Sequence, residues 1–330
     1  MKSITTLVLA ALVALPALSA AATRDSFLFA FLYMEPGGRP GGLGKSFTAV
    51  ADDTNAGFYN PGGYALQEKN GVSVMHEPRG TGDLKDMFYD YVGMTYGFGK
   101  YGRLGATVTY HNSGKIQKTN DQGEVTGYMH AYDVAPSVYW SYALLPEKLG
   151  VGAGLTYAYE HLTDEPGGVQ QQPLFNAGVF YRTPLPRLNV GAAFVNLGTN
   201  VKGTRDDSSG ETVTYSSPPP RTVRLGVAYT PLSNAMNDLL VTADGSKLLM
   251  NLDEGFSTEL GQGVYSGGVE YKYAKMVSIR GGYYYDFYGE ITGLALGFGF
   301  AYKGIGFDYA RIPEGSQFEN RNRFAVSYTF

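Results

Sequence analysis

Cysteine is absent from the 330 residues of this chain, which excludes disulfides, thiolate metal sites and a cysteine nucleophile. An excess of one charge is absent too, because 26 basic and 30 acidic residues leave a net charge of -4. A chain without a basic excess does not suggest a nucleic-acid partner. The four histidines do not stand at metal-ligand spacing. We therefore expect no metal, no cofactor and no nucleic acid.

Long apolar runs are missing beyond the N-terminus. There, Lys2 precedes the run ITTLVLAALVALPAL and the small residues SAAA follow it, in the order of a secretory signal peptide. Ser19 and Ala21 fit the cleavage positions, which predicts a signal peptide over 1–21 and a mature chain from Ala22. The alternative is a membrane anchor, but a spanning helix needs about twenty apolar residues. No later stretch reaches that length, and we expect no helical span.

Glycine and tyrosine are abundant instead, with 45 and 27 residues. Past residue 70, apolar side chains alternate with small or polar ones, which places them on one face of a strand. A soluble sandwich also alternates, but its apolar faces are mainly aliphatic, whereas these carry many Tyr and Phe residues opposite Gly, Ala and Ser. The pattern favours an all-β chain that forms a transmembrane antiparallel β-barrel, with lipid outside.

The alternation predicts about fourteen strands, an even number as in bacterial barrels. These strands are expected near 71–77, 89–100, 102–112, 131–143, 149–162, 174–182, 187–197, 221–230, 238–247, 264–273, 276–286, 291–302, 305–311 and 322–330. Short connections are interpreted as periplasmic turns, at 100–102, 273–275 and 303–304. Longer polar ones are interpreted as extracellular loops, at 113–128, 163–173 and 199–220.

The sequence contains no complete catalytic or nucleotide-binding motif. The segment GLGKS, residues 42–46, resembles the end of a phosphate-binding loop, but that motif requires a glycine where Arg39 stands. The acidic loop RDDSSGE, 205–211, does not have the spacing of an EF-hand. No nucleophile elbow occurs, and no serine–histidine–acid set can be assembled from the sequence. We expect no catalytic residues and no enzyme.

Two further sets of residues follow from the strand pattern. Charged side chains on the small-residue face are predicted to point into the lumen, because charge facing lipid is costly. The predicted lumen charges are Arg224, Glu270, Lys272, Arg280, Asp308, Arg311 and Arg323. A final strand with aromatic residues on one face is a signal for the barrel-assembly machinery. The predicted assembly signal is Phe324, Val326, Tyr328 and Phe330.

The stretch RPGGLGKSFTAVADDTNAGFYNPGGYAL resembles the N-terminal signature of the FadL superfamily of outer-membrane barrels. Among the branches of this superfamily, PorV/PorQ is the one most similar to three blocks of the chain: NPGGYAL, DEGFSTEL (253–260) and VNLG (195–198). PorV usually has a longer form of the second block. We interpret the glycines as a plug segment that folds tightly against the barrel wall. The plug motif comprises Arg39, Gly41, Gly42, Gly44, Asp52, Asp53, Asn60, Pro61 and Tyr64. Arg39 and Lys45 are expected to pair with inward carboxylates such as Glu270 or Asp308.

The resemblance implies a signal peptide over 1–21, a plug over 22–70 and a barrel of about fourteen strands over 71–330, placed in the Gram-negative outer membrane among its lipids. A PorV-type protein would bind the C-terminal domain of type IX secretion cargo from the translocon and pass it to a sortase-like partner. The first alternative is a FadL-like transporter of hydrophobic compounds or long-chain fatty acids. That reading predicts an apolar, ligand-sized pocket continuous with a gap in the wall, whereas the shuttle predicts a lumen filled by polar contacts. The second alternative is a purely structural barrel.

Overall fold

The computed structural model describes residues 27–80, 86–120, 122–164, 168–206, 212–249, 263–287, 290–314 and 320–330. The predicted signal peptide over 1–21 with its cleavage site and the block 253–260 lie outside these residues, as does most of the acidic loop. Among the described residues, no helix is long and apolar enough to cross a membrane. The helical segments are short: η1 (Ala30–Tyr33), α2 (Gly38–Gly42), α3 (Ala56–Tyr59), η2 (Pro61–Leu66) and η3 (Gly99–Tyr101).

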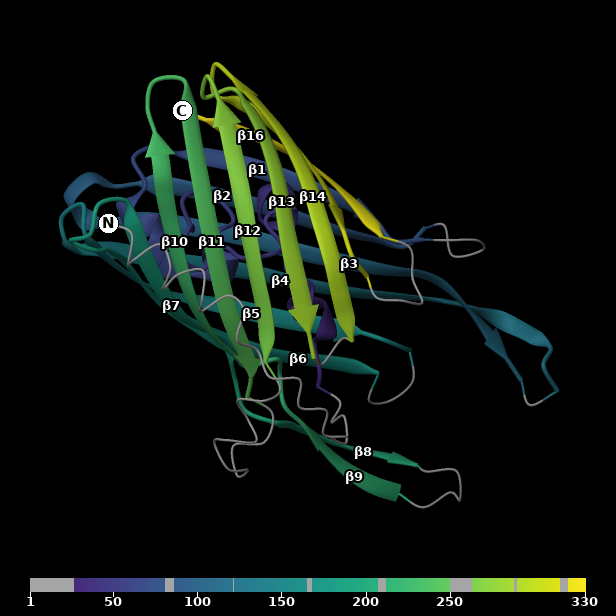
Figure 1. Ribbon diagram of the computed structural model, residues 1–330. Helices are drawn as coiled ribbons and strands as arrows, with labels where there is room; N and C mark the ends of the chain where they lie inside the picture. Colours follow the sequence, from purple (N-terminus) through teal and green to yellow (C-terminus); the bar gives the residue numbers. More distant parts are fainter. Residues whose placement is uncertain are drawn as a thin grey trace.

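Fourteen antiparallel strands close into a barrel in which the first strand pairs with the last (Figure 1). This confirms the predicted fold class. The first seven strands are β1 (Gly71–Pro78), β2 (Phe88–Gly97), β3 (Arg103–Thr119), β4 (Val125–Leu145), β5 (Leu149–His161), β6 (Val169–Arg182) and β7 (Leu188–Leu197). The others are β10 (Thr222–Ser233), β11 (Asn237–Leu248), β12 (Val264–Tyr273), β13 (Val277–Asp286), β14 (Ile291–Tyr302), β15 (Ile305–Ile312) and β16 (Arg321–Thr329).

The two faces of each strand differ as the alternation predicts. On β14, Leu294 and Leu296 are 69% and 59% exposed, whereas Ala295 between them is fully buried. The outward side chains therefore form an apolar belt that lipid can cover, and the small inward ones leave room in the lumen. Closing the sheet also pairs its edge strands, as a hydrocarbon environment requires.

Several connections differ from their prediction. Residues 113–119 and 125–128, expected in a loop, continue β3 and β4 as a hairpin that projects from the barrel (Figure 1). Their ladder runs on from Lys115–His130 to Thr119–Val125, because cross-strand pairing does not need an apolar face. The expected loop at 199–220 likewise contains a separate hairpin, β8 (Val201–Asp206) with β9 (Thr212–Ser217). β6 begins at Val169, so the last five residues of the loop predicted at 163–173 belong to this strand.

The two ends of the barrel are unequal. One end carries short turns such as 303–304 and the C-terminal Phe330, whose backbone is bonded to Asn70. The other end carries the long connections and the two projecting hairpins (Figure 1). In bacterial barrels, short turns face the periplasm and long loops face outward. We name these the short-turn end and the long-loop end.

Candidate functional site

The N-terminal residues 27–70, here called the plug, lie inside the barrel. The plug meets all fourteen barrel strands, always on their small-residue faces. Around the barrel, the strand residues that meet it are Ser73, Gly93, Gly105, Ser141, Gly150, Gly178, Gly191, Gly226, Asp244, Gly268, Gly282, Gly297, Ala310 and Arg323. A segment that contacts the full circumference closes the axial route through the lumen at its own level.

Glycine on the strands is what allows this close approach. A methyl group added at Gly191 would stand 2.2 Å from the carbonyl oxygen of Thr48, and one at Gly282 would stand 2.2 Å from the backbone nitrogen of Gly44. On the plug side, Gly44 itself turns the chain with a φ of 65°. The run that resembles a nucleotide loop is therefore a backbone pressed against glycine-lined strands.

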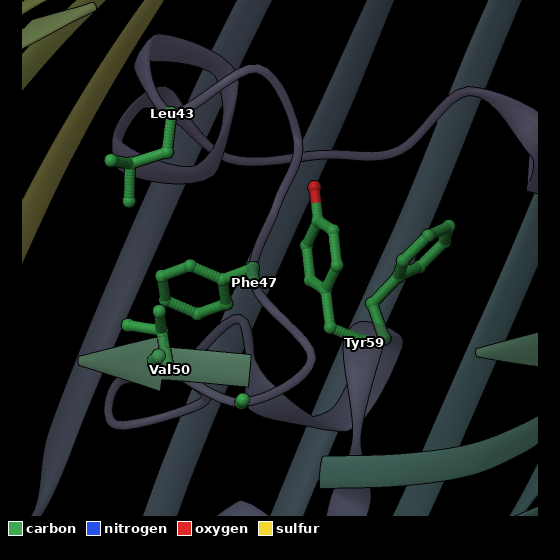
Figure 2. Close-up of a cluster of buried hydrophobic side chains, with 7 residues drawn as sticks. Leu43, Phe47, Val50 and Tyr59 are labelled. Carbon is green, nitrogen blue, oxygen red and sulfur yellow. The ribbon is translucent and has the colours of Figure 1, made fainter. Parts of the chain in front are cut away.

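The middle of the plug has an apolar core of its own. Leu43, Phe47, Val50 and Tyr59 are buried together, and Figure 2 shows their side chains gathered within the folded segment, with strands behind them. The rings of Phe47 and Tyr59 meet edge to face at 5.3 Å between centroids, and the hydroxyl of Tyr59 donates to the carbonyl of Pro36 at 2.8 Å. The plug thus has a fixed shape rather than acting as a loose filler.

The Asn–Pro motif fixes the plug to the wall. The side-chain oxygen of Asn60 accepts from the backbone of Gly62 at 3.0 Å and so begins η2. Its amide nitrogen donates to the carbonyls of Thr48 in the plug and Val179 on β6, both at 2.9 Å. Ser141 on β4 donates to the carbonyl of Pro61 at 2.7 Å. Asn60 and Pro61 therefore join plug to wall through hydrogen bonds.

Arg39 is the ionic centre of the short-turn side of the plug. It donates two hydrogen bonds to Glu270 on β12, at 2.9 and 3.0 Å, and a further one to Asp52 at 2.5 Å. Arg280 on β13 extends the network, because it binds Glu270 at 2.6 Å and Asp308 at 2.6 Å. The pairing of Arg39 with Glu270 agrees with the sequence prediction, and Asp308 is bound by Arg280 instead.

A cavity of about 330 Å³, lined mainly by polar residues, lies beside this network, between the plug and strands β1 and β16. Asp53 lines it and accepts from the backbone and side-chain nitrogens of Asn55 at 2.8 Å each. Burial raises the pKa of Asp53 to about 6, although the charge of Arg39 lowers it; the charge of Asp52 raises it by less than Arg39 lowers it. The carboxyl group is therefore poised to titrate near neutral pH.

A second buried network holds the plug nearer the long-loop end. Arg224 on β10 forms a short hydrogen bond with Glu35, and Lys45 stands 3.9 Å from the same carboxylate. Arg323 on β16 binds both Glu77 on β1 and the carbonyl of Glu35. Burial lowers the pKa of Lys45 despite that neighbouring carboxylate. Lys45 thus pairs with a carboxylate of the plug rather than with the predicted Glu270 or Asp308.

Toward the long-loop end, the lumen contains an apolar cluster that we call the chamber. It is formed by Phe29, Phe31, Leu32, Ala135, Ala158 and Leu174. Phe29 is fully buried there with a φ of 58°, a left-handed conformation that costs a bulky residue about 1–3 kcal/mol. The first residues of the plug therefore occupy the chamber under backbone strain.

The hydrogen-bonded ladder between β4 and β5 lacks two pairs beside the chamber, although its register is the same on both sides; we call this step the gap. Strands β4 and β5 pair up to Val134–Tyr159 and resume at Ser137–Thr156, which leaves Ala135 and Pro136 without a partner in β5. Proline has no N–H to donate, and within a sheet it marks an edge or an irregularity. Inside the gap lie chamber residues, and outside it Pro136 lines a groove of about 480 Å³.

The groove lies on the outward face of β2 to β5 and is almost entirely apolar. Its lining is Val92, Met94, Ala106, Thr107, Val108, Pro136, Ser137, Val138, Leu155 and Tyr157. Two of these, Thr107 and Ser137, belong to the buried inward faces of their strands. The floor of the groove therefore includes the sheet itself, at the step where the ladder lacks its pairs.

Most predicted lumen charges lie inward. Arg224, Glu270, Arg280 and Arg323 are buried, and Lys272 and Asp308 are partly buried in the same networks. Arg311 is a correction, because it is exposed on the outward face of β15 between the buried Ala310 and Ile312. A period of two cannot place Asp308 and Arg311 on one face. Arg311 lies one residue from the long-loop end of β15, where an arginine can reach polar surroundings.

The residues of the predicted assembly signal share the outward face of β16 and its end. Phe324, Val326, Tyr328 and Phe330 are all exposed, and the rings of the last two stack at 5.6 Å. Their role in assembly stays a prediction. Among the described residues, no group of three His, Cys, Asp or Glu side chains is placed to hold a metal ion.

Comparison with known proteins identifies the family. The sequence model of the uncharacterised protein family (UPF0164) matches residues 13–254, well over half of the chain. The chain belongs to this family. No curated protein sequence matches the UPF0164 chain. The match includes the plug and the strands from β1 to β11.

Solved structures resemble the UPF0164 barrel over nearly its whole length. The toluene transporter TbuX of Ralstonia pickettii has 14% identity and a TM-score of 0.55, covering 89% of this chain and 97% of its own. The toluene transporter TodX of Pseudomonas putida has 12% and 0.53, covering 88% and 96%. The monoaromatic hydrocarbon channel CymD has 14% and 0.56, covering 92% and 98%. Such identities show a shared fold.

The sequence reasoning missed the chamber and the wall gap. Phe29 lies in a segment before the recognised motif, and its partners on β4, β5 and β6 are more than a hundred residues away. Pro136 was visible as a proline inside an alternating strand, which is the one signal that could have located the gap.

Proposed function

We propose that this UPF0164 protein is an outer-membrane transporter of hydrophobic compounds, in which the solute leaves the lumen sideways through the wall. The observation that carries the proposal is that an apolar cluster inside the wall and an apolar groove outside it lie back to back at the step where β4 and β5 lack ladder pairs. The chamber residues Ala135 and Ala158 line the inside of the unpaired step, and Pro136 and Tyr157 line its outside. A hydrophobic solute can therefore stay in apolar surroundings while it crosses the sheet.

The plug supports a sideways exit. It contacts every strand of the barrel on the short-turn side of the chamber, and ion pairs join it to the wall. An axial route would bring an apolar solute against buried charges such as Arg39 and Glu270, which is unfavourable on both sides. A lateral route ends in the hydrocarbon of the bilayer, where the solute is most soluble.

The neighbours in fold point the same way. TbuX and TodX are toluene transporters, and CymD is a channel for monoaromatic hydrocarbons. The polar networks around the plug fit the PorV-type secretion shuttle as well, but no comparison brings in a secretion component. The transporter alternative predicts an apolar pocket beside a gap in the wall, and the apolar chamber next to the step in the β4–β5 ladder supports it. We accordingly favour the transporter over both the shuttle and a purely structural barrel, and we propose no catalytic role.

A reversible cross-link across the gap tests the proposal. The chain has no cysteine, so Ala135→Cys with Ala158→Cys introduces one defined pair on adjacent strands. Tyr142→Cys with Val151→Cys is the matched control, because these residues are partners in the continuous part of the same ladder. Uptake of ethylbenzene by intact Gram-negative cells that express each variant is measured before and after reduction.

If the gap is the exit, oxidation of the first pair lowers uptake to that of cells without the barrel, and reduction restores it. The control pair leaves uptake unchanged in both states. Unchanged uptake with the first pair oxidised, verified by mass spectrometry, would remove the lateral route. Equal uptake in cells with and without the wild-type barrel would count against transport as a whole.

A further inference from the structure

A row of three titratable side chains borders the chamber. His111 on β3, Asp133 on β4 and Glu160 on β5 are direct cross-strand neighbours, because the ladders pair His111 with Asp133 and Asp133 with Glu160. Directly opposed side chains on antiparallel strands have Cβ atoms about 5 Å apart. On the same strands, two residues further along, lie Ala135 and Ala158 of the chamber. The row therefore forms a polar margin to an apolar space.

The two carboxylates have no ion-pair partner of the kind that Glu77 and Glu270 have. Asp133 and Glu160 are 4% and 6% exposed, and among the described residues neither has a lysine or arginine partner. His111 binds only one oxygen of Asp133, at 2.9 Å. The other oxygen of Asp133 and one oxygen of Glu160 have no hydrogen-bond donor within the described part of the chain. A buried carboxylate pair of this kind favours a cationic donor between its members.

The occupant of this place in the structure is Phe29. Its ring is fully buried in the chamber, and its backbone N–H lies beside the carboxyl group of Glu160. Nitrogen, two carbons and a phenyl ring are also the skeleton of 2-phenylethylamine. Phe29 thus presents to the chamber a ring and an N–H donor at the spacing of an arylalkylamine, but as a neutral amide.

Resting on the transport function proposed above, we propose that the chamber selects arylalkylamines, with their protonated nitrogen between Asp133 and Glu160 and their ring in the place of Phe29. A charged ammonium offers three donors where the amide of Phe29 offers one. An anionic amphiphile such as a fatty acid is disfavoured at the same place, because its carboxylate would meet two more.

Binding of three matched probes to the full barrel in lipid nanodiscs tests the selection. The probes are 2-phenylethylamine, which is cationic, phenylacetate, which is anionic, and ethylbenzene, which is neutral. We expect the amine to bind at least about tenfold more tightly than phenylacetate, as a charge-assisted hydrogen bond provides. The double variant D133N/E160Q removes both charges with little change of shape. It should lose about tenfold of amine affinity and bind ethylbenzene within about twofold of wild type.

D164N is the matched control, because Asp164 is a carboxylate at the long-loop end whose side chain is 56% exposed. It should leave all three affinities unchanged. F29A supplies an independent arm: removal of the competing ring should raise amine affinity, whether or not the double variant folds. If ethylbenzene binds but the amine binds no more tightly than phenylacetate, the proposed selection of arylalkylamines is wrong. An unchanged amine affinity in F29A would also overturn it. Neither result contradicts the proposed transport function. Equal ethylbenzene uptake by cells with and without the barrel defeats transport, whatever the binding results.

Discussion

Gly282 on β13 provides the sharpest test of how the plug is seated. A methyl group there would stand 2.2 Å from the nitrogen of Gly44, 2.4 Å from the carbonyl carbon of Leu43 and 2.7 Å from the Cα of Gly44. All three are backbone atoms of the plug, so no side-chain rotation relieves the clash. At the preceding residue, Gly281, an added methyl meets nothing within 4 Å. Gly282→Ala and Gly281→Ala are therefore a matched pair.

The expected cost of Gly282→Ala follows from the distances. Ordinary contact requires the plug backbone to retreat by more than 1 Å, and overpacking of this size costs about 3 kcal/mol, at the upper end of the usual range. If the plug carries that cost, its opening equilibrium rises about a hundredfold. Gly281→Ala should instead stabilise its strand by a few tenths of a kcal/mol, because glycine is unfavourable in strand interiors.

Hydrogen exchange of the folded barrel, followed by mass spectrometry of peptides from residues 35–66, measures the opening directly. We expect faster exchange throughout these peptides in Gly282→Ala and wild-type exchange in Gly281→Ala. Peptides from the outward hairpin of β3 and β4 serve as an internal reference. Equal protection of the plug in the two variants would refute the argument that its backbone rests directly on the glycine-lined wall.

Two further predictions concern the charges of the plug. Arg39→Met removes one partner of a buried ion pair and should weaken the plug by about 3 kcal/mol, since Glu270 keeps its bond to Arg280; hydrogen exchange measures the change, and unchanged protection would contradict it. Asp53 should titrate near pH 6 by carbon-13 NMR, lower in Asp52→Asn and higher in Arg39→Met. Because its pKa is raised on folding, the plug should become more stable as the pH falls from 7 toward 5.

The number of strands and the direction of their side chains were predictable, because the outward face must be apolar to meet lipid and the inward face must be small to leave space for the plug. Leu294 and Ala295 show this, since one must meet hydrocarbon and the other must leave space. The ion pair between Arg39 and Glu270 was predictable for a related reason: a buried guanidinium in a lumen requires an inward carboxylate. Arg311 was placed in the lumen because a charge that faces lipid is costly. Its position three residues from Asp308 puts it on the opposite face of the strand.

The chamber could not be predicted because it depends on contacts between distant segments. Nothing in the residues around Asp133 and Glu160 distinguishes them from other alternating strand positions, and only the register places them side by side. The projecting part of β3 and β4 was missed because its residues are polar on both faces, so the apolar alternation ends before the hydrogen-bonded ladder does.

The full circle of contacts around the plug has a consequence for how the chain matures. Glu35 is bonded to Arg323, 288 positions later, so the plug can complete its contacts only after the last strand is in place. Contacts between such distant positions form slowly, because a long loop must close first. The plug is thus the first part of the described chain to be synthesised and the last to complete its native contacts. A barrel that lacks one hairpin would have a smaller circumference, and the plug could not make all its contacts there. The fit of the plug therefore depends on the correct number of strands.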